Sequence, residues 1–465
     1  MERRFEVRKA ELFAECQVSP TLFQGFEERL RTFSEPFSQL LQRSEQVVHA
    51  QTYMQGLLSD LERKNAESIA YRHDQDRRGL QNFVGGSSWD HRPLLTELAR
   101  QVGTQLNEAD GVLSLDPSGF VKRGNKSVGV QRQWIGRLGK VDNGQVGVYL
   151  SYASRLEHTM VDVRLYLSKE WAKDKRRRRA CGVPKEIRFQ TRHDLALEML
   201  TEKGYLLPHR WITGDDEMGH SSRFRAALRE RQEQYLLAVP WNTLIRDLEA
   251  PLPKWSGRGR PPQRPFQQMQ VWAASRAPEA WRRIDVKDGE KGPLVLEITK
   301  TRVVARTDTR RIGPEETLVV TRTRDETGSL RYDYYLSNAA RDTALEEFGR
   351  VAQTHHRIEE CLQRAKSETG LADYEVRTWA GWHHHQTLSL LATWFLVRES
   401  QRGKKIGTCS HRSPSATRYS EVAPSMLRVL EARTYCTGVR TPTPAHGRST
   451  TLSLEETEPV GTITG

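Results

Sequence analysis

Apolar residues recur at helical spacing along the first part of the chain. Between Glu11 and about Leu106 they stand three and four positions apart, as in FEERLRTFSEPFSQLLQ and YMQGLLSDLERKNAESIAY. This spacing places them on one face of a helix, where they can pack together. The pattern predicts a separate α-helical domain over residues 1–106.

After residue 106 the apolar residues fall into short runs that are typical of strands. GVLSLDPSGF contains Asp116 followed by Pro117, which biases the residue before it toward extended geometry. RQWIGRLGKV and QVGVYLSYAS follow, separated by Asp142, Asn143 and Gly144. Asn-Gly is typical of a hairpin turn, because both residues tolerate positive φ. We therefore expect Asp116 at the C-terminal end of a first strand, and a hairpin turn at Asn143 and Gly144.

Strand and helix patterns then alternate up to residue 240. MVDVRLYLS reads as a strand, HDLALEMLTEKG as an amphipathic helix, RWITGDD as a strand that leads to Asp215, SSRFRAALRERQEQ as a helix and YLLAVP as a strand. Antiparallel strands followed by β-α-β alternation predict a mixed sheet with helices on its faces. Residues 107–240 are therefore predicted to form the first part of an α/β core.

A segment rich in proline, glycine and arginine interrupts this alternation. It contains APLPKWSGRGRPPQRP and the strand-like runs PLVLEIT and ETLVVTRT. We interpret residues 241–331 as a β-rich insertion rather than a continuation of the sheet. Helical patterns return within residues 332–400, which we expect to complete the core. Residues 401–465 are rich in Ser, Thr, Pro and Gly and are predicted to be a poorly ordered tail.

The charge balance favours a polyanionic partner. The chain has 72 Lys and Arg against 59 Asp and Glu, a formal net charge of +13. Such an excess favours nucleic acid before an anionic membrane. The longest apolar run, Thr387 to Val397, is about half of the roughly 20 residues that a spanning helix needs, and the first ten residues hold no apolar leader. We expect no membrane association and a cytoplasmic, nucleoid-associated location.

Acidic residues at predicted strand ends and on a late helix suggest metal chemistry. Asp116 and Asp215 follow predicted strands, and Glu359 and Glu360 lie within the helical stretch HHRIEECLQRAK. Carboxylates brought together in this way suit Mg²⁺ or Mn²⁺, which take oxygen ligands. Spacing alone favours a structural role for each aspartate taken singly, since an Asp in such a place more often caps a helix or closes a turn. The five scattered cysteines lack a CxxC pair, so neither a disulfide framework nor a zinc site is supported.

Helical periodicity separates the two adjacent glutamates. Ile358 and Leu362 belong to a stripe that should face the core. Glu359 lies about 100° round the helix from Ile358, at the edge of that stripe. Glu360 lies about 200° away and precedes Arg364 by the spacing of a solvent-exposed ion pair. Periodicity therefore favours Glu359 for a role inside a site.

Several long stretches together carry a family resemblance. They are GLLSDLERKNAESIAY, LDPSGFVKRGNKSVGVQRQWIGRLGKVDNGQVGVYLSY, DVRLYLSKEW, GDDEMGHSSRFRAALRERQEQYLLAVP, YYLSN and HRIEECLQRAKSETGLADYEVRTWAGWHHHQTLSLLATWFL. Over these stretches the chain resembles the DDE transposases of bacterial insertion sequences, in particular the insertion sequence seven-zero-one family, which is related to the insertion-sequence-four group. The resemblance implies a ribonuclease H-like α/β fold, a mixed-sheet core with a β-rich insertion, preceded by the α-helical N-terminal domain.

The resemblance also implies a reaction and the residues that carry it. By position, the catalytic and metal-binding triad would be Asp116, Asp215 and Glu359, with Asp216 as second choice for the second acid and Glu360 as a bystander. They would hold two Mg²⁺ ions, with Mn²⁺ as an alternative. The reaction would be DNA cleavage at mobile-element ends, followed by transfer of the freed 3′-hydroxyl into target DNA. The partners would be double-stranded DNA, as terminal repeats and target, and a second subunit in a homodimer on DNA.

The sequence departs from the family at some expected phosphate contacts. Many relatives have a second Asp where Pro117 stands, and the insertion-sequence-four group has Arg and Tyr where this chain has His355 and Ala352. Lys366 retains its place and is predicted to contact phosphate, and Arg357 could substitute for the missing Arg. Because of these departures and the unusual tail, two alternatives stay open: an inactive DNA-binding regulator derived from a transposase, and a ribonuclease H-like nuclease without strand transfer.

Further DNA-binding candidates lie in basic runs. One run could neutralise several phosphates or could be a solvated charge run; its residues are Arg176, Arg177, Arg178 and Arg179. GRGRPP, with Arg258 and Arg260, has the core of an AT-hook, in which a flat extended backbone lets arginines enter the minor groove, but a short basic Pro/Gly loop is more often just a linker. The consecutive His383, His384 and His385 point about 100° apart on a helix and cannot all bind one metal; core packing or DNA contact is favoured for them.

Overall fold

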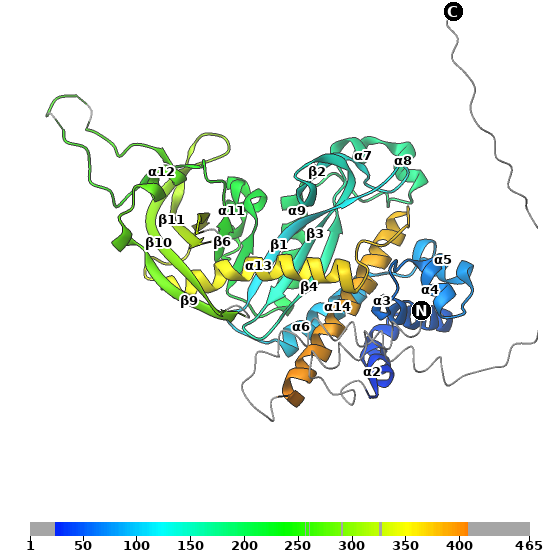
Figure 1. The fold of residues 1–465 in the computed structure, drawn as a ribbon. Helices are drawn as coiled ribbons and strands as arrows, with labels where there is room; N and C mark the ends of the chain where they lie inside the picture. The colour runs from blue at the N-terminus through cyan, green and yellow to red at the C-terminus, as the bar shows by residue number, and fades with distance from the viewer. Residues whose placement is uncertain (1–23, 256, 260, 290–291, 325–327, 408–465) are drawn as a thin grey trace, which may run out of the picture.

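The structure is a computed structural model that describes residues 24–255, 257–259, 261–289, 292–324 and 328–407. The predicted poorly ordered tail beyond residue 407, the chain start and Arg260 lie outside the described residues. The rest is a mixed α/β fold with one large mixed sheet, as the sequence predicted (Figure 1).

The core of the sheet has parallel strands at its centre. In space the order is β4-β3-β1-β5-β6. Strand β1 is parallel to β5, β5 is parallel to β6, and β3 is antiparallel to both β1 and β4. The bounds are β1 (Val112–Val121), β3 (Lys140–Ala153), β4 (His158–Leu165), β5 (Trp211–Gly214) and β6 (Tyr235–Ala238). All four residues of β5 are buried, because helices cover both faces of the sheet there.

The predicted hairpin turn at Asn143 and Gly144 was wrong. The turn lies at Gly136–Leu138, between β2 (Gln131–Ile135) and β3, and Gly139 has a φ of 59°. Gly144 lies inside β3, where a Cβ would stand 2.4 Å from the carbonyl oxygen of Phe120. This glycine permits close approach of β1 rather than a turn, a role that local sequence does not distinguish.

The strands of the insertion continue the core sheet, which corrects the prediction that they would not. Strand β12, most of which lies beyond the predicted end of the insertion at residue 331, pairs antiparallel with β6, with Leu336 opposite Leu237, and the order then runs β12-β11-β10-β7-β8, with β9 on β10. The bounds are β7 (Leu244–Asp247), β8 (Gln267–Gln268), α12 (Met269–Ala274), β9 (Arg282–Gly289), β10 (Gly292–Arg306), β11 (Ile312–Arg324) and β12 (Leu330–Ser337). These strands also have an apolar cluster of their own, which includes Trp272, Leu318 and Leu336.

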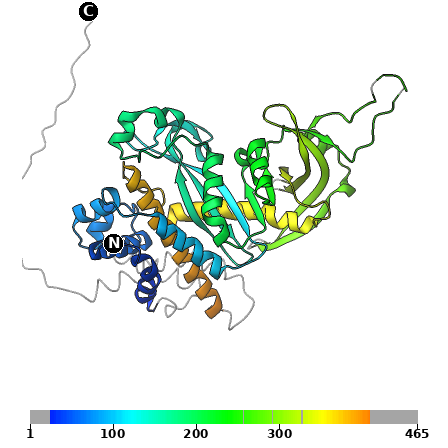
Figure 2. The ribbon, with the colours of Figure 1, turned by 180° about the vertical axis from the view of Figure 1, so that it is seen from behind.

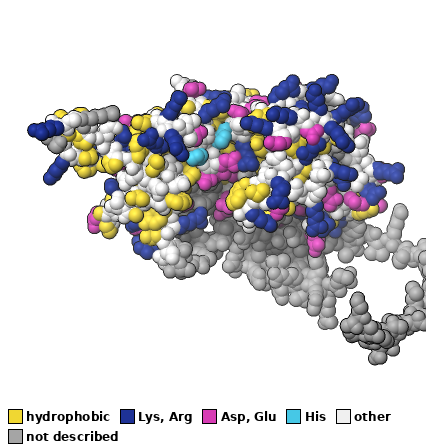
Figure 3. Space-filling model, turned by 90° about the horizontal axis from the view of Figure 1, so that it is seen from above, with side chains coloured by type: hydrophobic (Ala, Val, Ile, Leu, Met, Phe, Trp, Pro, Cys, Tyr) yellow, Lys and Arg dark blue, Asp and Glu magenta, His cyan; other side chains and the backbone are white. Residues whose placement is uncertain are grey.

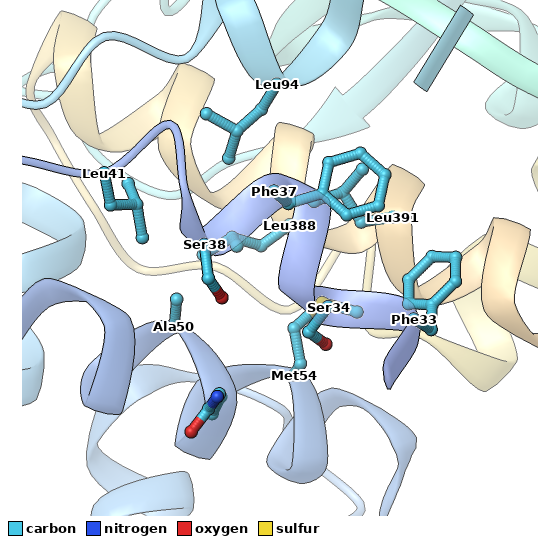
Figure 4. A pocket seen from close by; sticks show the side chains of 11 residues that line it. Phe33, Ser34, Phe37, Ser38, Leu41, Ala50, Met54, Leu94, Leu388 and Leu391 are labelled. Atoms are coloured by element: carbon cyan, nitrogen blue, oxygen red, sulfur yellow. The ribbon is translucent and has the colours of Figure 1, made fainter. Parts of the chain in front are cut away.

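Helices near the start pack against the last described helix. They are α2 (Phe26–Ser38), α3 (Ser44–Leu58), α4 (Ala66–Arg72), α5 (Arg77–Gly85), α6 (Arg92–Gln105) and, at the end of the described chain, α14 (Trp379–Gly407). Their apolar side chains join those of the sheet in one continuous cluster. Between α2, α3, α6 and α14, side chains such as Phe37 and Leu391 leave about 20 Å³, roughly the space of one water (Figure 4). The helical prediction agrees with this, and the domain boundary at residue 106 stays a prediction.

The remaining helices flank the sheet. Their bounds are α7 (Lys169–Lys173), α8 (Lys175–Ala180), α9 (Arg192–Lys203), α10 (Asp216–His220), α11 (Ser222–Glu230) and α13 (Leu345–Glu368). Helix α9 contacts β3 and β4, and α13 extends from the insertion across the core strands (Figures 1 and 2). Within the described ranges, no helix is long and apolar enough to cross a membrane.

Candidate functional site

The pairing of β1 with β5 brings Asp116 and Asp215 together. Leu115 and Gly214 are the last partners in the parallel register, and each aspartate is the next residue. Neighbouring strands lie about 4.8 Å apart, so the two aspartates start from adjacent positions. Asp116 continues within β1, opposite Tyr149, rather than ending the strand as predicted.

Asp215 leaves β5 and caps the short helix α10. Its Oδ1 accepts a hydrogen bond from the backbone N–H of Met218 at 3.0 Å. Asp215 therefore caps a helix, and it also lies next to Asp116. Asp216, the second choice, is exposed and is the first residue of α10, one position further from β5 than Asp215.

The two aspartates occupy an environment that disfavours their charged forms. Burial raises the pKa of Asp116 to about 7; Lys366 opposes this rise, and the charges of Glu359 and Glu217 add to it. Burial and the neighbouring Asp116 raise the pKa of Asp215 well above its usual range. A positive charge placed between such carboxylates would lower both pKa values.

Helix α13 runs alongside β1 and carries Glu359 past the aspartates. Arg350 Nη2 donates to the carbonyl oxygen of Asp110 at 2.9 Å, and Lys366 Nζ donates to Ser118 Oγ at 2.8 Å. Between these contacts the helix rises about 24 Å and the strand about 26 Å. The two elements therefore cover nearly the same length and stay side by side. Glu359 lies between the contacts, close enough for its charge to raise the pKa of Asp116.

Glu360 acts on different surroundings. Its charge is among the causes that raise the pKa of the buried Cys361 thiol, after burial itself. Ile358 and Leu362 are buried, as the helical stripe predicted. Both glutamates are exposed, so the edge position expected for Glu359 is more open than periodicity indicated. Because Glu359 and Glu360 point to different sides of α13, their charges still act on different groups.

The donor chemistry of these acids fits a hard divalent cation. Asp116, Asp215 and Glu359 offer only carboxylate oxygens, which Mg²⁺ and Mn²⁺ prefer. The raised pKa of Asp116 and Asp215 marks a place where a cation would relieve repulsion. Among the side chains that the structure describes, no three of Asp, Glu, His or Cys stand close enough to hold a metal ion.

Lys366 lies beside the acids, and Arg357 does not. Lys366 lies over the Phe120 ring at 5.0 Å and opposes the rise in the pKa of Asp116. Arg357 Nη1 donates to the carbonyl oxygen of Ser154 at 3.0 Å. Ser154 follows the end of β3 that pairs with the start of β1, away from Asp116. The structure therefore does not bring Arg357 to the acids, and the side chain of His355 lies outside the described residues.

The arginine run divides into two kinds of residue. Arg177 stacks on the Trp171 ring at 3.9 Å and donates to the carbonyl oxygen of Val130, and Arg178 donates to the carbonyl oxygen of Pro184. Arg176 and Arg179 are exposed on α8. Arg176 and Arg179 therefore take no part in the packing that holds Arg177 and Arg178. The run thus combines packed arginines with exposed arginines that are available to phosphate.

The loop between β7 and β8 turns where an AT-hook would be extended. Gly257 and Gly259 have φ values of 79° and 78°, and Trp255 Nε1 donates to the carbonyl oxygen of Arg258. The Arg258 side chain is exposed. This backbone geometry favours the hypothesis that the loop is a linker over the hypothesis that it is an AT-hook.

The three consecutive histidines are packing residues. His384 stacks on Trp89 at 3.7 Å, and its two ring nitrogens lie 2.9 Å and 2.8 Å from the carbonyl oxygens of Val84 and Trp89, one of which accepts a hydrogen bond from the ring N–H; His385 hydrogen-bonds with the Tyr53 hydroxyl. Burial lowers the pKa of His384 to about 4. A cavity of about 370 Å³ lies beside His383 and His384, and none of the three candidate acids lines it.

Sequence reasoning did not choose Glu217 for the site. It lies two residues after Asp215 in α10, pairs with Arg192 at 2.5 Å, and helps to raise the pKa of both Asp116 and Asp215. The signal was the acidic run GDDE, in which Asp216 and Glu217 both stood as alternatives and Asp215 was preferred. Figure 3 shows acidic side chains grouped near the middle of the upper face, with Lys and Arg around them. Such an arrangement suits a cation at the centre and a polyanion across the rim.

Comparisons with known proteins agree with the resemblance. A family model described as DDE superfamily endonuclease matches residues 36–293. The chain is 39% identical over 94 residues to the probable transposase for insertion sequence element IS701 of Microchaete diplosiphon, a match that covers 20% of this chain and 25% of that protein. The match thus spans about a quarter of the curated relative's length.

Among solved structures, the chain is similar to piggyBac transposase in a synaptic complex with hairpin DNA. The identity is 11% and the TM-score is 0.41, with 87% of this chain and 78% of that chain covered. The family model is the stronger finding, since it spans more than half of the chain and includes Asp116 and Asp215. The predicted resemblance is confirmed: the chain belongs to the DDE superfamily of endonucleases.

Proposed function

We propose that the protein is a transposase that cuts DNA at the ends of a mobile element and joins the freed 3′-hydroxyl to target DNA. The observation that carries the proposal is the juxtaposition of Asp116 and Asp215 in a member of the DDE endonucleases. Glu359 is the proposed third acid, because its charge reaches Asp116 whereas that of Glu360 acts on Cys361.

The three acids would hold divalent cations, which we propose to be two Mg²⁺ ions with Mn²⁺ as an alternative. Bound there, the ions would supply activation of the attacking oxygen and stabilisation of the leaving oxygen. Asp116 must release a proton to become a ligand, and its pKa of about 7 sets where that happens. Lys366 would contact the phosphate beside these acids, because its ammonium already lies next to Asp116.

The proposed partner is double-stranded DNA, as element ends and as target. The net charge of +13 supports a polyanionic partner. Arg176, Arg179 and Arg258 are proposed phosphate contacts because their side chains are exposed. The N-terminal helices are proposed to recognise the element ends. We also propose a homodimer on DNA and a cytoplasmic location with the nucleoid.

One reaction separates this function from its alternatives. Full-length protein is mixed with Mg²⁺, target plasmid and labelled DNA fragments taken from the two sequences that flank the gene. We expect labelled ends joined to the plasmid. Cleavage without joining would instead indicate a ribonuclease H-like nuclease, and binding without cleavage would indicate a regulator; either result would overturn the proposal.

A further inference from the structure

Helix α10, which carries Asp215 at its start, is tightly held at its other end. It has only five residues. Its penultimate residue, Gly219, lies so close to β6 that a Cβ there would stand 1.8 Å from the carbonyl oxygen of Ala238. The carbonyl oxygen of Gly219 accepts a hydrogen bond from Nη1 of Arg225 on α11. Because α10 is so short, a shift at Gly219 would be passed on to Asp215.

The same guanidinium reaches into the insertion. Arg225 Nε donates to Oε1 of Glu316 on β11 at 3.0 Å, and the Tyr235 hydroxyl donates to the same oxygen at 2.5 Å. The side chains of Arg225 and Glu316 are 5% and 0% exposed, so the ion pair is fully buried. Helix α11 lies between the insertion strands and the core strands (Figure 1). Arg225 thus connects Glu316 of the insertion with the helix that Asp215 caps.

Stability alone does not account for this pair. Removing two charges from water costs several kcal/mol for each ion, and apolar side chains of similar volume often serve as well. The other carboxylate oxygen of Glu316, Oε2, has no hydrogen-bond partner among the described residues. What the pair supplies is geometry, because a guanidinium can donate to Glu316 and to Gly219 at the same time and a lysine ammonium cannot span both.

We propose that Arg225 and Glu316 are positioning residues through which the insertion holds Asp215 in place for the cation. The inference rests on the proposed function, since it assumes that Asp215 is a ligand. The insertion then contributes to the geometry of the acids as well as to any surface for DNA.

The test compares Arg225→Lys with Arg229→Gln in the full-length protein. Arg229 contacts Glu316 at 3.5 Å, Tyr235 and the carbonyl oxygen of Glu315, but none of its hydrogen bonds or ion pairs reaches α10. Titration with Mn²⁺, followed by the EPR signal of the free ion, should show an affinity lowered about 10- to 100-fold by Arg225→Lys. Arg229→Gln should lower it less than about threefold, because the contact with Gly219 stays intact.

A second readout follows α10 directly. The amides of Met218 and Gly219 bond to Asp215, so their hydrogen exchange should be about 10-fold faster in Arg225→Lys and unchanged in Arg229→Gln. If Arg225→Lys does not fold, the double variant Arg225→Met with Glu316→Leu replaces the pair by apolar side chains and should show the same two losses.

Equal Mn²⁺ affinity in Arg225→Lys and the wild type, or equal losses in both arginine variants, would overturn the positioning role. The proposed function fails separately. A wild-type protein that binds Mn²⁺ but does not cut element ends contradicts the transposase, whereas loss of Mn²⁺ affinity confined to Arg225→Lys still supports the positioning role.

Discussion

Two polar clusters of this protein, one buried and one partly buried, respond to burial in opposite ways. At the histidine cluster on α14, the ring nitrogens of His384 and His385 contact backbone carbonyl oxygens and a tyrosine hydroxyl. Burial lowers the pKa of His384 to about 4 and the pKa of His385 to about 3. At the acid site, burial raises the pKa of Asp116 to about 7 while neighbouring acids repel it. The first cluster is held by contacts within the protein. The second holds carboxylates whose pKa values are strongly raised, and such perturbed groups distinguish a candidate functional site from a packed interior.

The largest effect should come from removing an acid of the second cluster. Asp116→Asn and Asp215→Asn should each lower DNA cleavage by about 1,000-fold or more, because a ligand of the cation is lost, while binding of the uncut ends survives. Cleavage and gel-shift assays on the same preparations measure both. Asp216→Asn is the matched control and should keep most activity; loss in Asp216→Asn with activity in Asp215→Asn would show that the second acid was wrongly assigned.

The adjacent glutamates give the next comparison. Glu359→Gln should abolish cleavage to a similar degree, and Glu360→Gln should retain activity within about threefold, because only Glu359 acts on Asp116. The rate of single-strand nicking under single-turnover conditions is the measurement. Substantial activity in Glu359→Gln together with loss in Glu360→Gln would reverse the assignment.

The histidine cluster should behave as structure alone. His384→Ala removes a stacked ring and the hydrogen bond that the ring donates to a backbone carbonyl oxygen, so we expect the free energy of unfolding to fall by about 3 kcal/mol. Urea unfolding measures this change, and Mn²⁺ affinity should be unaltered at a temperature where the variant is folded. A variant of full stability with weakened Mn²⁺ binding would assign the histidines to the site instead.

The two clusters should give opposite pH dependence in buffer without divalent cations. The pKa of Asp116 is raised in the folded state, so stability should fall as pH rises from about 4 to about 7, by about 3 kcal/mol. The pKa of His384 is lowered, so its contribution is present above about pH 6.5 and is lost as pH falls toward 4.

Single substitutions separate these two contributions. Asp116→Asn should flatten the fall in stability between pH 4 and 7, and added Mg²⁺ should do the same for the wild type near pH 7, because the cation replaces the proton. Thermal unfolding across this range is the measurement. An unchanged profile in Asp116→Asn would contradict the raised pKa of this residue.

The smallest effects should come from the arginine run on α8. There too, residues held by the protein lie beside residues that are available to a partner. Arg176→Ala and Arg179→Ala should each weaken DNA binding a few-fold and reduce the slope of log affinity against log salt by about one, because each removes one phosphate contact. Arg177→Ala should mainly lower stability, because its side chain is held by Trp171 and Val130. Equal salt slopes in the wild type and in Arg176→Ala would exclude this face from the DNA path.

Local patterns succeeded where neighbours in sequence decide the outcome. The buried Ile358 and Leu362 on α13 and the helices between residues 26 and 105 follow from periodicity, since a helix places its contacts three and four residues apart. Patterns failed at Gly144, which packs against the backbone of another strand, and at the insertion, whose strand β11 joins the core sheet through β12. Strand pairing is non-local, so a short apolar run does not reveal its partner.

By itself the sequence determined the kinds of element, the resemblance to DDE transposases and the candidate acids, because these depend on residue type and spacing. Only the tertiary structure decided that Asp116 adjoins Asp215, that Glu217 shares their surroundings and that Arg357 turns toward Ser154. It also decided which buried groups lack a partner. The physical reason is that strand pairing sets the distance between charged groups and burial sets the free-energy cost of keeping them charged. Both depend on residues far apart in the sequence, so no short stretch of the chain reveals them.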